Sequence, residues 1–100
     1  MMVSESDMLL PNTKINISKH ARVRIIERHI KIDDVFDALN NPVQLVYDTW
    51  NDVYIAVSSR SYAVVYAFRG SCIEVLTVLG KREYNALISK FGSKRYKIIA

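Results

Sequence analysis

The hydrophobic positions follow a helical period in the first part of the chain and a strand period in its middle. Residues 14–17 alternate polar and apolar side chains, which is compatible with a short first strand. Residues 18–28 carry an apolar stripe apart from most of their basic side chains, which predicts an amphipathic helix with Ser18 as its N-cap. A second helix is predicted from Ile32, where acidic residues favour the positive end of the helix dipole, to the turn before Pro42.

Four segments rich in β-branched and aromatic residues follow, at residues 43–48, 53–58, 62–68 and 72–79. Because the turns between them are too short for crossovers, we expect a four-stranded antiparallel meander. Residues 82–90 predict a C-terminal helix stopped by Gly92, and residues 96–100 form either a last strand or a tail. The order of elements predicts an α+β fold, with the N-terminal helices packed on one face of the antiparallel sheet. The other face, or one end of the sheet, is expected to be free to bind a substrate.

One domain is expected, because the chain has 100 residues and 50% of them are hydrophobic. Residues 1–12 are predicted to be a flexible leader and residues 13–100 the folded domain. The start of the chain is acidic, and its apolar part is too short for a secretion signal. No apolar run approaches the roughly 18 residues of a membrane span. We therefore expect a cytoplasmic protein that does not bind a membrane.

The positive charge is concentrated near the C-terminus. Residues 81–100 hold six basic side chains against one acidic one, a net charge of +5, whereas residues 1–80 hold eight basic and nine acidic ones, a net charge of −1. Because Phe91 and Tyr96 lie among these cations, the segment suits nucleic acid better than a membrane surface. The predicted nucleic-acid contacts of this basic segment are Lys81, Arg82, Lys94, Arg95 and Lys97.

His20, Arg24 and Arg28 share one face of the first predicted helix, because they recur every four residues. Metal-free cleavage of RNA needs a base for the 2′-hydroxyl and cations for the charge that builds up around phosphorus. A histidine and two arginines suit these roles, so the three residues are candidates for catalysis or phosphate binding. The alternative is an exposed helix face, on which the arginines pair with Glu27 or with the second helix.

A family resemblance rests on the order of motifs in the chain. The motifs are His20-Ala-x-x-Arg24-x-x-x-Arg28-x-Ile30, a helix that ends near Asn-Pro, and strands that close on Glu74-Val-Leu-Thr77-Val. Over residues 17–80 this order resembles the small prokaryotic family named domain of unknown function 4258. That family has been grouped by fold with RelE-like and colicin-type ribonucleases. The resemblance therefore implies a RelE-like toxin fold, without establishing an activity.

The resemblance also implies which residues form a catalytic site: His20, Arg24, Arg28 and Thr77. Thr77 is predicted to share a strand face with Val75 and Leu79, and a threonine in a strand is usually structural. His29 departs from the family, which usually has a small residue there, often glycine. We expect His29 to be a linker residue that packs at the end of the helix.

The leading hypothesis is a metal-free endoribonuclease of toxin type. Its partners would be RNA, including ribosome-bound mRNA or tRNA, and an acidic antitoxin. One alternative is a non-catalytic nucleic-acid-binding or regulatory module on the same fold. Another is a protein-interaction domain that uses the tyrosine-rich sheet or an exposed strand edge. No cofactor and no metal are expected, because the glycines are isolated and acidic residues at a helix start need no metal to explain them.

Overall fold

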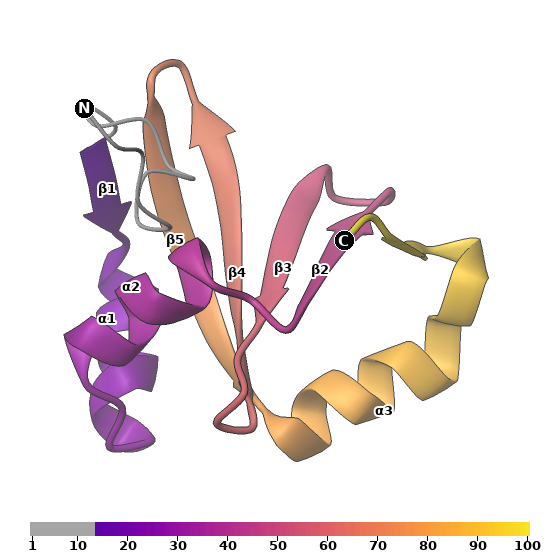
Figure 1. Ribbon diagram of the computed structural model, residues 1–100, viewed down its shortest axis with the longest axis horizontal. Coiled ribbons are helices and arrows are strands. Elements are labelled where there is room, and N and C mark those ends of the chain that lie inside the picture. The colour runs from indigo at the N-terminus through magenta and orange to yellow at the C-terminus, as the bar shows by residue number, and fades with distance from the viewer. Residues whose placement is uncertain (1–13) are drawn as a thin grey trace.

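Three α-helices and a six-stranded sheet make up residues 14–100, the residues that the structure, a computed structural model, describes (Figure 1). The predicted leader, residues 1–12, lies outside the described residues. In chain order the elements are β1 (Lys14–Ile17), α1 (Lys19–Glu27), α2 (Ile32–Asn40), β2 (Gln44–Asp48), β3 (Val53–Val57), β4 (Tyr62–Arg69), β5 (Cys72–Gly80), α3 (Lys81–Phe91), a 3₁₀ turn (Gly92–Lys94) and β6 (Tyr96–Ile98). Within the described part of the chain, no helix has the length and apolar character needed to cross a membrane.

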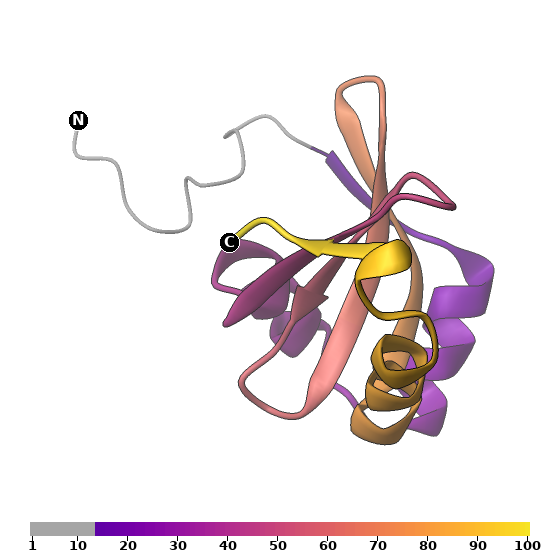
Figure 2. The same ribbon diagram turned by 90° about the vertical axis from the view of Figure 1, so that its right-hand side faces the viewer.

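The strands lie in the order β1-β5-β4-β3-β2-β6. The four central strands form the predicted antiparallel meander, because tight turns join them. The prediction of a four-stranded, purely antiparallel sheet was wrong at both edges. There, β1 pairs in parallel with β5, and β6 pairs antiparallel with β2 (Figure 2). The alternation at residues 14–17 had indicated β1, and a last strand was one of two alternatives for residues 96–100, but strands of four and three residues do not reveal which strand each pairs with.

Helices cover both faces of the sheet, so the first of the two predicted binding regions, a free sheet face, was wrong. The second, one end of the sheet, stays a prediction. The helices α1 and α2 lie on one side of the sheet and α3 lies on the other (Figure 1). In β4, Val64 packs in the core with α1 and α2, whereas its neighbours Ala63 and Val65 pack with α3. The sequence does carry a signal for this, because β4 is apolar at nearly every position, as expected for a strand buried on both faces.

A β-bulge interrupts the pairing of β4 with β5. Val65 lies opposite Thr77 and Tyr66 lies opposite Val75, so Leu76 has no partner in the register. The bulge shifts the alternation by one residue. Val75 therefore packs with α1 and α2, whereas Thr77 takes the face of Val65, which α3 covers. For this reason the prediction that Thr77 shares a face with Val75 was wrong, whereas the predicted shared face with Leu79 is confirmed.

Candidate functional site

The helix α1 covers the part of the β5 edge that β1 leaves unpaired, since β1 pairs only with the first half of β5. Beyond the paired half of β5, the Ser18 hydroxyl donates to the carbonyl of Leu76 at 3.0 Å. Ser18 also caps α1, as predicted, because its side chain accepts a hydrogen bond from the Ala21 amide at 3.0 Å. Further along the helix, Arg24 Nε donates to the carbonyl of Val78 at 3.4 Å. The arginine face of α1 is thus directed along β5 toward the start of α3.

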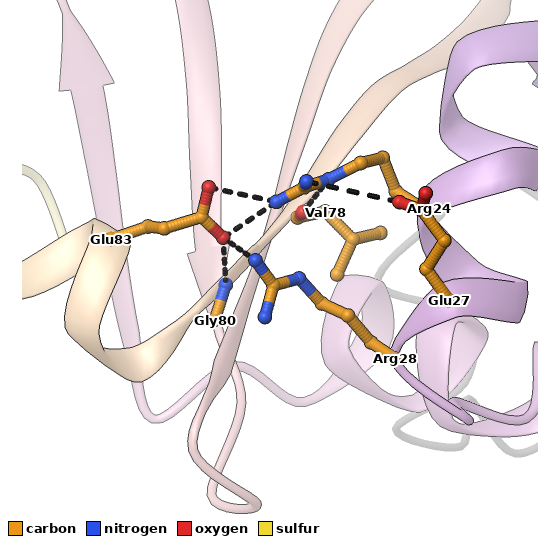
Figure 3. A network of polar contacts seen from close by, with 6 residues as sticks. All are labelled: Arg24, Glu27, Arg28, Val78, Gly80 and Glu83. Atoms are coloured by element: carbon orange, nitrogen blue, oxygen red, sulfur yellow. Dashed lines mark hydrogen bonds and ion pairs between the residues drawn. The ribbon is translucent and has the colours of Figure 1, made fainter.

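Arg24 and Arg28 both contact the carboxylate of Glu83, in the first turn of α3 (Figure 3). Arg24 Nη2 donates to Oε1 and Oε2 of Glu83 at 2.6 and 2.7 Å, and Arg28 Nη2 donates to Oε1. The same Oε1 accepts from the amide of Gly80 at 3.1 Å, so Glu83 also caps α3. Glu27, one of the predicted partners, lies 3.9 Å from Arg24 Nη1. The main partner of the two arginines is therefore on α3.

This ion network joins α1 to α3 at the edge of β5. The side chains of Arg24, Arg28 and Glu83 are 23%, 32% and 41% exposed, so solvent screens their charges only in part. Gly80 permits the arrangement, because a Cβ at that position would lie 2.5 Å from Arg28 Nη1. Two guanidinium groups share the Glu83 carboxylate here, and Glu27 lies at the outer side of Arg24. The buried Nε of Arg28 has no hydrogen-bond partner among residues 14–100.

Sequence reasoning missed Glu83, which counted only as the one acidic residue of the basic segment. A local signal was present, because a glutamate at the third position of a helix often caps the helix start. The contact with Arg24 and Arg28 has no local signal, since the partners are 59 and 55 residues apart in the chain.

A polar pocket of about 380 Å³ opens where the end of α1, the start of α2, the β3–β4 turn and the first residue of α3 meet. We call it the cationic pocket, because its charged lining consists of three basic side chains and one acidic one, beside an imidazole: Arg28, Arg60, Lys81, Asp34 and His29. Arg60 Nη1 lies 3.9 Å from Asp34 Oδ1, which is beyond hydrogen-bond distance. Tyr62 also lines the pocket, and burial raises the pKa of its phenol, which is therefore protonated at neutral pH.

His29 has a backbone conformation that favours glycine, with φ of 55°. It follows the C-cap of α1, where the amides of His29 and Ile30 donate to the carbonyls of Ile26 and Ile25 at 3.1 and 3.0 Å. These two bonds form a Schellman motif, in which glycine is the usual residue at this position. The small residue expected from the family resemblance fits this geometry. The chain has instead a histidine, and this residue lines the cationic pocket, a placement that was not predicted from the sequence.

His20 and Thr77 do not line the cationic pocket. His20 is exposed at the start of α1, eight residues before Arg28, which is about 12 Å along a helix axis at about 1.5 Å per residue. Thr77 is partly buried on the sheet face that α3 covers. The structure thus brings Arg24 and Arg28 together on Glu83, and of the four residues implied by the resemblance only Arg28 lines the pocket.

Of the predicted nucleic-acid contacts in the basic segment, Lys81 lines the cationic pocket. Arg82 is exposed in the first turn of α3, Lys94 is exposed in the 3₁₀ turn, and Lys97 is exposed on β6. Because β6 forms the sheet edge opposite to β1, Lys97 lies away from the pocket. Arg60 was not predicted, since a single basic residue in a serine-rich turn has no charge pattern to mark it.

Arg95, the remaining predicted contact, is bound within the fold. Its Nε and Nη2 donate to Oδ1 and Oδ2 of Asp48 at 3.0 and 2.9 Å, and the two side chains are 14% and 3% exposed. Its guanidinium carbon lies 4.7–5.1 Å from the centroids of three aromatic rings, those of Trp50, Phe91 and Tyr96. Burial alone would raise the pKa of Asp48, but hydrogen bonds from Arg95 and from two backbone amides outweigh it, so the pKa lies below its ordinary value.

Within residues 14–100, no three histidine, cysteine, aspartate or glutamate side chains are grouped so as to hold a metal ion. Comparison with curated proteins and with solved structures finds no match to this chain. A family model described as "Domain of unknown function (DUF4258)" matches residues 17–79, from the end of β1 almost to the end of β5. Lys81 and Glu83 follow directly after the matched region. Since the match spans more than half of the sequence, the chain belongs to the DUF4258 family, as the resemblance implied.

Proposed function

We propose that the protein binds RNA through its phosphate backbone, with one phosphate in the cationic pocket. The observation that supports this most is the convergence of Arg28, Arg60 and Lys81 from three separate elements on one cavity of about 380 Å³. Like charges repel one another, so cations gathered around a cavity favour an anionic ligand that offsets the repulsion. RNA is the proposed anion because the family resemblance implies a RelE-like fold, and because the segment that follows the pocket is basic.

The pocket cations keep donors for a phosphate. Arg28 uses only Nη2 in its bond to Glu83, and Arg60 is only loosely paired with Asp34. Lys81 forms no ion pair within residues 14–100. Lys81 is also the first residue of α3, whose positive dipole end favours an anion nearby. Arginine can bind two phosphate oxygens at once, so these side chains suit a phosphodiester.

The test is the affinity of the protein for a fluorescently labelled single-stranded RNA. The double variant Arg60→Gln with Lys81→Gln removes two pocket cations, and we expect it to weaken binding by about tenfold or more. The control variant, Lys94→Gln with Lys97→Gln, removes the same charge from exposed positions outside the pocket. Its affinity should fall by about twofold or less. Equal losses in the two variants would mean that the basic segment binds diffusely and that the pocket is not the site.

We propose RNA cleavage without a metal ion as a second function of the same pocket. It is supported by His29, the histidine that lines the cationic pocket beside Arg28 and Lys81. The imidazole would take the proton of a 2′-hydroxyl while the 2′-oxygen attacks phosphorus. The 5′-oxygen would leave with a proton from the phenol of Tyr62, which gives a 2′,3′-cyclic phosphate and a free 5′-hydroxyl. Arg28 and Lys81 would stabilise the negative charge that develops on the phosphate oxygens.

Cleavage of labelled RNA in the presence of a chelator tests this second function. We expect His29→Ala to abolish cleavage and His20→Ala to leave it unchanged. The reverse result would support the assignment of His20 that the resemblance implies and would exclude His29. If the wild-type protein binds RNA but does not cleave it, the protein is a non-catalytic binding module and this second function is excluded. A toxin-type protein should also copurify with an acidic antitoxin that competes with RNA for the pocket cations.

A further inference from the structure

A second pocket adjoins the cationic pocket. It has a volume of about 240 Å³ and lies between the β3–β4 turn and the first two turns of α3. We call it the apolar pocket, because most of its lining surface is apolar. The lining residues are Val43, Val57, Tyr62 and Tyr84 together with Ser58, Ser59, Ser61, Lys81 and Asn85. The two pockets share a wall, which is formed by Ser61, Tyr62 and Lys81. An anion-binding cavity and an apolar cavity are thus in direct contact.

We propose that the apolar pocket holds the unpaired base of the nucleotide whose phosphate occupies the cationic pocket. The inference rests on the proposed RNA-binding function and adds to it that the ligand is single-stranded. A nucleotide joins a charged phosphate to a flat, largely apolar base, which is the pairing of properties that the two pockets present. In double-stranded RNA the bases are stacked and paired, so a duplex cannot insert one into a pocket without unpairing it.

The size of the apolar pocket supports one base. Pockets for drug-sized ligands enclose about 300–1,000 Å³, so the volume of about 240 Å³ suits a single ring system. One aromatic side chain is available to contact the base: Tyr84 lines the pocket and is half-buried, whereas Tyr62 is 8% exposed and packs in the core behind the shared wall. The exposed amide of Asn85 lines the same pocket, and its side chain can both donate to and accept from a base edge.

The wall between the pockets is held by hydrogen bonds. In the β3–β4 turn, the Ser58 amide donates to the carbonyl of Tyr62 at 2.8 Å, and the Arg60 amide donates to the Ser58 hydroxyl at 3.0 Å. On the α3 side, the Tyr84 hydroxyl donates to Gln44 Oε1 at 3.0 Å, which fixes the ring. A wall held in this way needs little reordering when a ligand binds, which favours affinity.

The test compares one single-stranded RNA with the same RNA carrying an abasic site at its centre and with its duplex. The RNAs are kept short enough for one protein to bind, so that the central nucleotide is the preferred one. We expect the intact strand to bind about tenfold more tightly than the abasic strand, as stacking of one base predicts, and more tightly than the duplex. Equal affinities for the intact and abasic strands would overturn the base pocket while the phosphate-binding function stands. If the wild-type protein binds none of the RNAs, the phosphate-binding function fails, and the base pocket fails with it.

Two measurements test whether the preference for the intact strand over the abasic strand arises in the apolar pocket. Asn85→Leu narrows the apolar pocket from the helix side and should reduce the ratio of intact to abasic affinity by at least about threefold. Ala86→Leu is the matched control, because Ala86 is also exposed on α3 but does not line the pocket, and it should leave the ratio unchanged. In the wild-type protein, adenosine 5′-monophosphate should shift the amide signals of Val57 and Asn85, and ribose 5-phosphate should not. Equal shifts from the two compounds, or equal ratios in the two variants, would overturn the proposal.

Discussion

Replacing Glu83 with glutamine should weaken the fold and strengthen RNA binding at the same time. Glutamine keeps the shape of the side chain and an oxygen that can accept the hydrogen bond from the Gly80 amide. It removes the charge that Arg24 and Arg28 share. The substitution therefore tests the ion network with little change in packing.

The expected loss of stability follows from the exposure of the three side chains. Fully exposed ion pairs contribute about 0.2–1 kcal/mol, and loss of one partner of a buried pair costs about 3–5 kcal/mol. Because Arg24, Arg28 and Glu83 are 23%, 32% and 41% exposed, the value should lie between these limits and nearer the lower one. We expect Glu83→Gln to lower the free energy of unfolding by about 1–2 kcal/mol, a value that includes the loss of the contacts with both Arg24 and Arg28.

Urea unfolding followed by circular dichroism measures this loss. An unchanged slope of the free energy of unfolding against urea concentration shows that the folded and unfolded states of the two proteins expose the same surface. Glu27→Gln is the matched control, because Glu27 lies 3.9 Å from Arg24 and its side chain is 58% exposed. Its effect should stay below about 0.5 kcal/mol. In the same Glu83→Gln protein, RNA affinity should rise, since the two guanidinium groups no longer share a carboxylate. Unchanged stability, or weaker RNA binding by a folded variant, would refute the reasoning.

Two further substitutions test the strained histidine and the buried ion pair. His29→Gly should raise the free energy of unfolding by about 0.5–1 kcal/mol, because glycine adopts the positive φ without steric cost. A lower melting temperature would contradict this gain in stability. The same substitution should abolish any RNA cleavage. Asp48→Asn should cost about 3 kcal/mol in urea unfolding, since it leaves the charge of Arg95 buried without its partner. Because the pKa of Asp48 is lowered in the folded state, its contribution is present above the unfolded value of about 3.9 and is lost as the pH falls through the folded value. Wild-type stability should thus fall more steeply below about pH 4 than that of Asp48→Asn, and parallel pH curves would exclude this role.

The elements with strong local signals could be predicted from the sequence. The Ser18 cap marks the start of α1, and the alternating apolar segments with tight turns predict the central meander. Short strands at residues 14–17 and 96–100 were indicated as possible, but their places at the sheet edges could not be predicted, because β1 and β6 pair with strands that are distant in sequence. The bulge at Leu76 could not be predicted either, because nothing in the alternation of β5 shows that Thr77 leaves the face of Val75.

The partners of the charged side chains were the part of the candidate site that the sequence predicted least. The spacing of Arg24 and Arg28 correctly predicts that they are neighbours, but only the tertiary structure brings Glu83 to them. Arg95 looks like one more cation of a basic tail, yet Asp48, 47 residues earlier, binds it in the folded chain. The cationic pocket draws its residues from four parts of the chain, so no local motif could reveal it.

The central claim is that a phosphate of single-stranded RNA is bound in the cationic pocket. The most direct test is the salt dependence of RNA affinity for the wild type and for Arg60→Gln with Lys81→Gln. Each lost phosphate contact should reduce the slope of log affinity against log salt by about 0.7 for single-stranded nucleic acid. Because one phosphate occupies the pocket, the account predicts a slope that is shallower by about 0.7 in the double variant. Parallel salt curves for the two proteins would contradict it.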